Sequence, residues 1–444
     1  MRWLVVSLRS SENEFWSRNP RTCMVDGAEG GMMQERETTT CCIAGGGPAG
    51  IMLGYLLARA GVSVIVLEKH KDFFRDFRGD TIHPSTLEVM YELGLLEEFL
   101  KLPHQEMQRV GGQFGDFVFT GADFSRLTTH CKFIALMPQW DFLNFLAGHG
   151  KQFRTFDLRM EHEATGLLEE GGRIKGVRVK TPKGSIEIAA DLVVGCDGRH
   201  STVRDASGFE VMDFGAAVDV LWFHISRKAD DPEGALGRID YGQMLILINR
   251  SDYYQAGLIV RKDAFDSVKA AGLPAFRESL LQVAPFLGER VDEIKDWDQV
   301  KLLSVQINRL RHWSRPGLLC IGDSAHAMSP AGGVGINYAI QDAIATANIL
   351  AEALREHKVT ATLLTKVQER REFPVRIIQA LQAKIHNASL HFLGRPEKAK
   401  APWQMRAFLR IPGMQWMMAR GIGCGIRPEH IHTPLDKSAI RGTM

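Results

Sequence analysis

The sequence predicts an α/β protein built on a parallel sheet, with a second, β-rich unit and helices towards its C-terminal end. Three observations support this fold class. A glycine cluster joins a β-favouring run to a helical stretch near residue 45, and two later apolar strands each end abruptly in a pair of glycine and aspartate. Three β-rich segments follow from about residue 208, and helical patterns dominate after about residue 355.

The length, the net charge and the absence of several catalytic motifs exclude some classes of protein function. The chain has 444 residues, 45% of them hydrophobic, so two or three domains are expected. Lys and Arg total 54 against 52 Asp and Glu, a net charge of +2, and we expect no nucleic-acid partner. No G-x-S-x-G, P-loop or H-E-x-x-H pattern occurs, so hydrolase, phosphate-transfer and zinc protease chemistry have no support, and no metal site is expected.

The cysteines and the first residues indicate the compartment. The seven cysteines are odd in number, include no C-x-x-C pair and lie mostly in apolar strand-like runs, so we expect buried thiols and a cytoplasmic protein. Residues 1–38 are polar, lack periodicity and contain Met24, Met32 and Met33. We expect them to be a disordered extension or an over-long start that carries no chemistry.

The first motif is a dinucleotide fingerprint. Gly45, Gly47 and Gly50 form G-x-G-x-x-G between a strand and a helix, where glycine permits a tight turn and the approach of a pyrophosphate. Glu68 ends the next strand, where its carboxylate is placed to bond a ribose, and the helix amino end favours the phosphates. The unit predicts a Rossmann-like domain for one dinucleotide. NAD and FAD share the ADP half, so this motif does not choose between them.

Two later strands end in polar residues. An apolar strand over residues 191–196 ends in Asp197, and another over 318–321 ends in Asp323, before a proline and glycine loop and a helix that begins near Gly335. Ligands of doubly wound sheets lie beyond the carboxyl ends of the parallel strands. The three motifs are therefore expected to converge on one ligand.

Over about residues 39–350 the three segments resemble the fingerprints of single-component (group A) flavoprotein monooxygenases, the p-hydroxybenzoate hydroxylase group of FAD enzymes. The DG motif of that group matches at Asp197, Gly198, Ser201 and Arg204. Its GD motif matches at Gly322, Asp323, His326, Pro330, Gly332, Gly335, Asn337 and Asp342. The chain length leaves no room for the extra carboxyl-terminal domain of larger phenol hydroxylases, so the resemblance is to the shorter members.

The resemblance implies a tight, non-covalent FAD and a transient NADPH or NADH. Asp323 would bond the ribityl chain, and Asp197 would hold the pyrophosphate side and influence docking of the nicotinamide nucleotide. Arg78 and Gln139 match more loosely, and a surface arginine and a plain helix start stay open for them. The expected cofactor-binding residues are Gly45, Gly47, Pro48, Ala49, Gly50, Glu68, Lys69, Arg78, Gln139, Asp197, Arg204, Asp323, Pro330, Gly333, Gly335, Ile336 and Asn337.

The reaction implied by the resemblance is hydroxylation of an aromatic, even polycyclic, or otherwise electron-rich apolar small molecule by molecular oxygen through a flavin hydroperoxide. Epoxidation, or dehydrogenase or oxidase chemistry on the same fold, is the alternative. Backbone amides from Gly332 to Gly335 and the helix dipole would stabilise charge on the reduced ring. No catalytic residue is assigned. The candidates for a base are His224, Tyr241, Tyr253 and Tyr254.

The expected domains follow from these motifs. Residues 39–207 and 302–355 form a discontinuous FAD-binding domain with a β-meander between Asp157 and Ala190. Residues 208–301 form a β-sheet substrate domain that covers the flavin, with 117–124 and 132–140 as candidates for additional strands, and residues 356–444 form a helical region. Ser85 with Glu88 fits a capping box at a helix start. Residues 401–423 are rich in Met, Trp and Arg; we expect helices packed on the domain interface and no membrane contact, with membrane contact as the alternative. The oligomeric state is not predicted.

Overall fold

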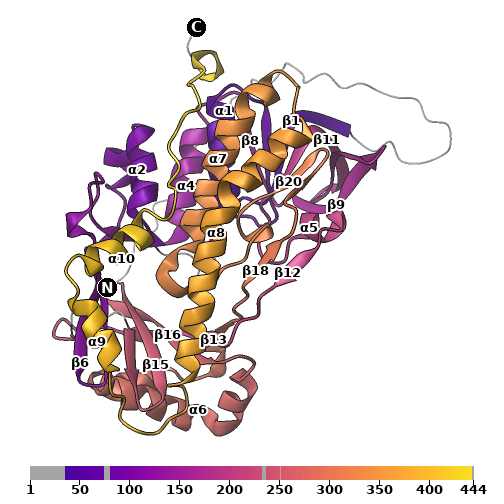
Figure 1. The fold of residues 1–444 in the computed structure, drawn as a ribbon. Coiled ribbons are helices and arrows are strands. Elements are labelled where there is room, and N and C mark those ends of the chain that lie inside the picture. The colour runs from indigo at the N-terminus through magenta and orange to yellow at the C-terminus, as the bar shows by residue number, and fades with distance from the viewer. Residues whose placement is uncertain (1–35, 75–80, 233–236, 251, 443–444) are drawn as a thin grey trace, which may run out of the picture.

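The computed structural model describes residues 36–74, 81–232, 237–250 and 252–442 (Figure 1). Its central element is an eight-stranded sheet with the order β19-β20-β11-β1-β2-β8, and β10 and β9 branch from β11. The pairs from β20 to β8 are parallel, whereas β9, β10 and β11 form the predicted antiparallel meander. The strands are β1 (Arg36–Ala44), β2 (Val64–Glu68), β8 (Phe156–Met160), β9 (Glu163–Glu170), β10 (Arg173–Thr181), β11 (Gly184–Gly195), β19 (Ser314–Arg315) and β20 (Leu318–Cys320). The predicted α/β class with a Rossmann-like parallel sheet is confirmed.

Helices cover this sheet and explain its apolar strands. β2 is buried along its whole length, as is typical of a parallel strand covered on both faces. α1 (Pro48–Arg59) packs against both α4 (Gln139–Gly150) and α7 (Gly335–Arg355). Gly54 permits a close approach of α1 to the sheet, because a Cβ added there would lie 2.6 Å from a methyl of Val66. On the other side α5 (Thr202–Ser207) lies against β9.

A seven-stranded sheet with the order β17-β13-β16-β15-β14-β5-β6 forms the lower half of the molecule (Figure 1). α6 (Phe265–Val283) covers one face, where Phe223 and Phe276 belong to the same apolar cluster. Its strands are β5 (Arg109–Phe114), β6 (Phe117–Asp123), β13 (Val218–Ser226), β14 (Gly237–Asp240), β15 (Gln243–Asn249), β16 (Tyr253–Arg261) and β17 (Lys301–Leu303). The predicted boundary at residue 208 therefore cuts through this sheet, because β14 pairs with β5 in parallel and brings in residues 109–123. The division into domains otherwise stays a prediction.

Two small sheets and three helices complete the middle of the molecule. The sheets are β3-β7-β4, from β3 (Thr81–Ile82), β4 (Gln105–Met107) and β7 (Ile134–Leu136), and β12-β18, from β12 (Val211–Asp213) and β18 (Asn308–Leu310). The helices are α2 (Pro84–Glu92), α3 (Leu96–Phe99) and α8 (Ala361–Leu390). The capping box proposed for Ser85 is wrong: Pro84 takes the first position of α2, so His83 is the N-cap and Ser85 lies inside the first turn.

The C-terminal region is only partly helical. α9 (Trp403–Arg410) and α10 (Met414–Gly423) follow α8, and the chain then runs without a helix to the upper end of the molecule, where Asp436 donates its backbone N–H to Arg59 (Figure 1). Residues 1–35 lie outside the described residues, and 36–38 belong to β1, so the predicted extension is too long by at least those three. The six cysteines in the described ranges are buried free thiols, as predicted, and Cys23 lies outside them. No described helix is both long and apolar enough to cross a membrane.

Candidate functional site

The glycine motif forms a tight turn that faces open space. Gly45 has φ +107°, and a Cβ there would lie 2.4 Å from the carbonyl oxygen of Cys196. A Cβ at Gly50 would lie 1.9 Å from the carbonyl oxygen of Gly45, so both positions require glycine. Gly47 is the N-cap of α1, and a Cβ there meets no protein atom within 4 Å. The turn is therefore closed on the protein side and open at the helix amino end, where an anion is favoured.

Around that turn, Pro48 is the first residue of α1 and Ala49 is buried behind it. Glu68 ends β2 and is 8% exposed. Its two carboxylate oxygens accept the backbone N–H groups of Gly46 at 3.2 Å and His70 at 3.0 Å. This holds the carboxylate beside the glycine turn, as a ribose contact would need. Lys69 is exposed.

The DG segment folds as a self-contained turn before α5. Asp197 accepts hydrogen bonds from the Ser201 hydroxyl and, at 3.1 Å, from the backbone N–H of Val203. Burial raises the pKa of Asp197, against these hydrogen bonds and the nearby charge of Arg204. Arg204 is 8% exposed and donates to the carbonyl of Arg199 at 2.7 Å. Much of the hydrogen-bonding capacity of Asp197 and Arg204 is thus used to fix the turn itself.

The GD segment meets the DG segment at one ion pair. β11 lies between β1 and β20, and its last residue, Gly195, pairs with Ala44 of β1 and Cys320 of β20. Gly45 and Gly322 follow shortly after those partners, so the three motif ends lie along one edge of the sheet. The Asp323 carboxylate lies 4.0 Å from Arg199 Nε, and 40% of its side chain is exposed. The motifs thus end at the same edge of the sheet, and their convergence on one ligand stays a prediction.

The loop after Asp323 leads into α7. Pro330 is exposed, and Gly333 has φ +62° and accepts a hydrogen bond from the Thr81 hydroxyl at 2.9 Å. Gly335 opens α7, and a Cβ there meets no protein atom within 4 Å. Ile336 is half-buried and packs against the main core. Since the first amides of a helix have no partner inside it, this second helix start also faces open space with unpaired N–H groups.

Asn337 connects the start of α7 to a remote segment. Its Nδ2 donates to the carbonyls of Thr81 at 3.0 Å and Gly333 at 3.2 Å. Its Oδ1 accepts from the backbone N–H of His83 at 2.9 Å and the hydroxyl of Thr86 at 2.8 Å. The amide group is therefore occupied within the protein, which leaves the backbone N–H as the group of Asn337 available to a cofactor.

Helix α8 holds the same loop from behind, through side chains that sequence reasoning missed. Gln382 donates to the carbonyls of Ser329 and Ala331 and accepts from the Ser329 N–H, and His386 lies 2.7 Å from the Ser329 hydroxyl. Gln379 donates to the carbonyl of Ala327. All three are buried. Polar residues that repeat at intervals of three and four along an otherwise mixed helix were the signal available in the sequence.

A buried charged cluster lies beneath the GD turn. Asp342 accepts from the Gly322 N–H at 3.0 Å and from Arg371 Nε at 2.9 Å, and its Oδ2 lies 2.5 Å from Nε2 of His326. Burial alone would raise the pKa of Asp342, but His326 and Arg371 hold it below its usual range. Arg371 also pairs with Glu429 at 3.3 Å. The motif contained Asp342 and His326, whereas Arg371 and Glu429 come from remote segments and carry no sequence signal.

The remaining predicted residues are two expected cofactor contacts, Gln139 and Arg78, and the four candidate bases. Gln139 is the first residue of α4 and is half-buried, and Arg78 lies outside the described residues. Among the candidate bases, Tyr254 packs in the cluster under α6, edge-on to Phe286, so it faces away from the open side of the sheet.

The other three candidate bases lie nearer the surface. His224 is exposed and contacts the ring of Tyr253 at a centroid distance of 4.8 Å. Tyr241 borders a surface cavity of about 350 Å³ at the β14–β15 turn. The four candidates lie in β13, in β16 and at the β14–β15 turn of the seven-stranded sheet, and none is assigned as the base.

The open face of the seven-stranded sheet is apolar and leads back to the motifs. Trp222, Ile248 and Ile259 lie on the face away from α6. Ile248 also packs with the cluster that contains Leu136 of β7, and β7 pairs with β3, whose Thr81 contacts the GD loop. This apolar cluster, in which Trp222 is 7% exposed, is thus linked through β7 and β3 to the loop between Asp323 and α7.

Comparison with known proteins gives consistent matches. The family described as FAD binding domain matches residues 37–381. The 6-methylpretetramide 4-monooxygenase of Streptomyces rimosus is 30% identical over 384 residues, 84% of this chain and 90% of that protein. An uncharacterized aromatic compound monooxygenase of Bacillus subtilis is 27% identical over 70% of this chain, which spans only 60% of that protein. The solved OxyS anhydrotetracycline hydroxylase from Streptomyces rimosus is similar in fold, with a TM-score of 0.68, 23% identity, and 88% of this chain and 77% of that chain covered.

Proposed function

The chain belongs to the FAD binding domain family and is a flavoprotein monooxygenase of the p-hydroxybenzoate hydroxylase group, and from that premise we propose that it hydroxylates a polycyclic aromatic molecule with NADPH or NADH and molecular oxygen. The observation that carries the proposal is the meeting of the three motif ends beside two helix amino ends that face open space. The alternatives, epoxidation or dehydrogenase and oxidase chemistry, become outcomes of the test below.

The residues present fit FAD. Gly47, Gly198 and Gly335 belong to three different motifs, and at each of them a Cβ would meet no protein atom within 4 Å. The start of α1 would hold the pyrophosphate, Glu68 the ribose and Asp323 the ribityl chain, without a covalent link. When bound, FAD supplies the electron transfer from NAD(P)H and the activation of oxygen.

The protein's own part in the reaction is electrostatic and steric. The unpaired amides at the start of α7, together with the helix dipole, would stabilise negative charge on FAD held at this helix start. Ser329, fixed by Gln382 and His386, holds the loop that carries Pro330, which would help to bind FAD. The apolar sheet face with Trp222 excludes water and receives the substrate. The Arg199–Asp323 pair adjoins the side from which a nicotinamide nucleotide would dock.

The proposed substrate class rests on the name of the 30% identical relative and on the apolar face of the seven-stranded sheet. The 30% identical relative is named for 6-methylpretetramide, and the chain spans 90% of it. The face that carries Trp222, Ile248 and Ile259 offers apolar surface of the kind that a fused aromatic molecule would contact. Both observations favour a large, fused aromatic substrate.

Purified holoenzyme is tested against a fused tetracyclic phenol and a single-ring phenol of similar ionisation, under labelled oxygen gas. We expect the tetracyclic compound to accelerate NADPH or NADH oxidation and to gain one labelled oxygen as a hydroxyl group, while the single-ring compound does neither. Label in an epoxide would replace hydroxylation by epoxidation. A product without label, formed with no need for NADPH or NADH, would show an oxidase or dehydrogenase.

A further inference from the structure

The helices α9 and α10 expose more apolar surface than terminal helices packed on a domain interface would. α9 has no buried residue. Five large apolar side chains on the two helices and the turn between them are strongly exposed: Trp403 73%, Phe408 44%, Ile411 50%, Trp416 40% and Met417 54%. The expected packing therefore holds for one side of α10, whereas α9 contacts β6 without burying any of its residues. We call the five side chains and the cations beside them the α9–α10 surface.

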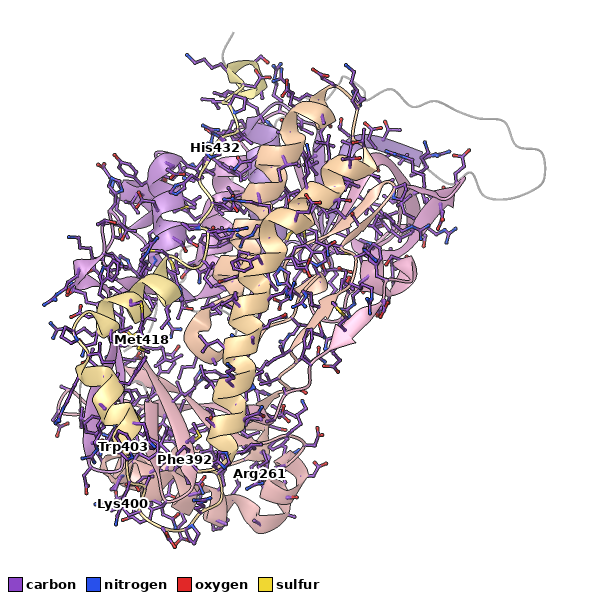
Figure 2. The ribbon with its side chains drawn as sticks, viewed as in Figure 1. Arg261, Phe392, Lys400, Trp403, Met418 and His432 are labelled. Carbon is purple, nitrogen blue, oxygen red and sulfur yellow. The ribbon has the colours of Figure 1, made fainter. Side chains whose placement is uncertain are left out.

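Contacts hold α10 and the segment before α9 to the rest of the protein, although the outer sides of both helices are exposed. On its inner side α10 places Met418, Ala419 and Ile422 against the cluster around Phe124. The segment before α9 is fixed by a hydrogen bond of 2.8 Å from the backbone N–H of Ala399 to Asp240. Figure 2 shows Met418, Trp403 and Lys400 along one edge of the molecule, beside the strands of the seven-stranded sheet. The exposed side chains thus sit on an ordered base.

Charge on this segment has one sign. Between residues 398 and 428 the sequence has six cations and no Asp or Glu, in a chain whose net charge is +2. The six are exposed: Lys398, Lys400, Arg406, Arg410, Arg420 and Arg427. Lys398 pairs with Asp116 at 2.7 Å and Arg406 lies over the ring of Phe117 at 4.9 Å. Asp116 and Asp240 both lie beside Lys398, at the start of the segment, and the cations of α9 and α10 follow after it.

Pro412 and Gly413 lie between α9 and α10, and the turn at these residues sets the direction in which the exposed apolar side chains of the two helices point. Gly413 has φ +82° and is the N-cap of α10. The chain turns there, so the apolar residues at the end of α9 and the start of α10 are presented from two short helices instead of one continuous core helix. Short helices with aromatic residues and cations on their exposed sides are typical of segments that lie in the plane of a membrane interface.

We infer that the α9–α10 surface binds the surface of an anionic phospholipid bilayer. Tryptophan favours the depth of the lipid headgroups, and arginine and lysine extend their charged ends towards anionic headgroups while their stems cover apolar surface. A second copy of the chain fits less well, because a two-fold contact would place this cationic surface against itself. The inference does not rest on the proposed reaction, and its test uses no activity measurement.

The test is co-sedimentation of the full-length holoenzyme with vesicles of phosphatidylcholine alone and of an equal mixture of phosphatidylcholine and phosphatidylglycerol. We expect binding to the mixed vesicles only, and release by high salt because exposed charges are screened. Arg406→Glu with Arg410→Glu should weaken binding by at least about tenfold, since each cation near an anionic surface contributes to the affinity. Trp403→Ala with Phe408→Ala should weaken it by about tenfold or more as well.

Matched controls separate this surface from general effects. Lys175→Glu with Lys180→Glu on β10 makes the same change of charge at two exposed residues elsewhere, and Leu302→Ala removes an apolar side chain that is 44% exposed on β17. Both should bind like the wild type, and the FAD content of every variant shows that it is folded. Three results would overturn the inference: no binding to either vesicle, binding that the α9–α10 variants leave intact, or a concentration-dependent dimer that Trp403→Ala abolishes.

Discussion

Oδ1 of Asn337 accepts a hydrogen bond from the backbone N–H of His83 at 2.9 Å, although 254 positions separate the two residues. His83 is the N-cap of α2 and Asn337 lies in the first turn of α7, so one side chain fixes the amino ends of two helices to each other. His83 in turn donates from Nδ1 to the carbonyl of Ile422 at 2.9 Å, in α10. The GD motif, the first half of the chain and the C-terminal helices are joined at this point.

Asn337→Leu should destabilise the protein by about 3 kcal/mol, because it leaves buried backbone and hydroxyl groups without partners. The measurement is urea unfolding of the FAD-free protein, so that loss of cofactor does not enter. Thr86→Val is the matched control: it removes one of the four hydrogen bonds and should cost about 1 kcal/mol. Equal stabilities of the two variants would contradict the role assigned to Asn337.

Gly47→Val should abolish FAD binding without unfolding the protein. The added side chain meets no protein atom within 4 Å at its Cβ but occupies the space in front of α1, where the pyrophosphate is proposed to lie. Flavin absorbance of the purified protein measures binding, and the thermal midpoint of the FAD-free form measures the fold. Gly50→Val is the contrast, because its Cβ would lie 1.9 Å from a carbonyl oxygen and must also destabilise the FAD-free form. A yellow Gly47→Val protein would show that the cofactor is misplaced.

Asp342→Asn should cost about 3 kcal/mol of stability, because Arg371, 1% exposed in its side chain, would lose the charge of its nearest carboxylate. The double variant Asp342→Leu with Arg371→Met should lose less stability than the sum of the losses in Asp342→Leu and Arg371→Met, with a coupling free energy of roughly 1–3 kcal/mol. Urea unfolding of the wild type, the two single variants and the double variant gives this coupling. Strict additivity would mean that the pair does not act as a unit.

Stability should fall in mild acid partly through His83. Burial lowers the pKa of His83 to about 4 from 6.5, against its hydrogen bond to Ile422. Between pH 6.5 and about 4 the unfolded chain therefore binds a proton that the folded protein does not, so the free energy of unfolding decreases as the pH falls. The stabilisation that His83 contributes as a buried neutral group is complete above pH 6.5 and is lost as the pH falls to about 4.

The check is the pH dependence of urea unfolding for wild type and His83→Asn, whose amide can still donate to Ile422. The variant should lose stability less steeply over this pH range. Burial also lowers the pKa of His386, so the slope should shrink and not vanish. Identical slopes would contradict a neutral, buried His83.

Local patterns predicted the parts of the fold that depend on neighbouring residues. The turn at Gly45, the strand that ends in Glu68 and the helix that starts at Gly335 are all present, because glycine position and apolar periodicity act over a few residues. A local pattern was wrong at Ser85, which was predicted to cap α2, because Pro84 takes the first helical position and His83 is the N-cap. For the seven-stranded sheet the local patterns were only partly successful. The candidate strand at residues 117–124 is confirmed as β6, the candidate at 132–140 was wrong because β7 joins another sheet, and the pairing of β5 with β14, more than a hundred residues later, was not predicted.

The sequence by itself determined the α/β class, the three motifs and their order, and through them the family of this protein. Only the tertiary structure decided that Asn337 bonds His83, that Arg371 and Glu429 complete a cluster around Asp342, and that α8 holds Ser329. It also decided that Trp403 faces outwards, where the sequence had led us to expect helices packed on the domain interface. The physical reason is that motifs act through the backbone within a turn or two, whereas burial and side-chain pairing depend on segments that become neighbours only when the chain has folded.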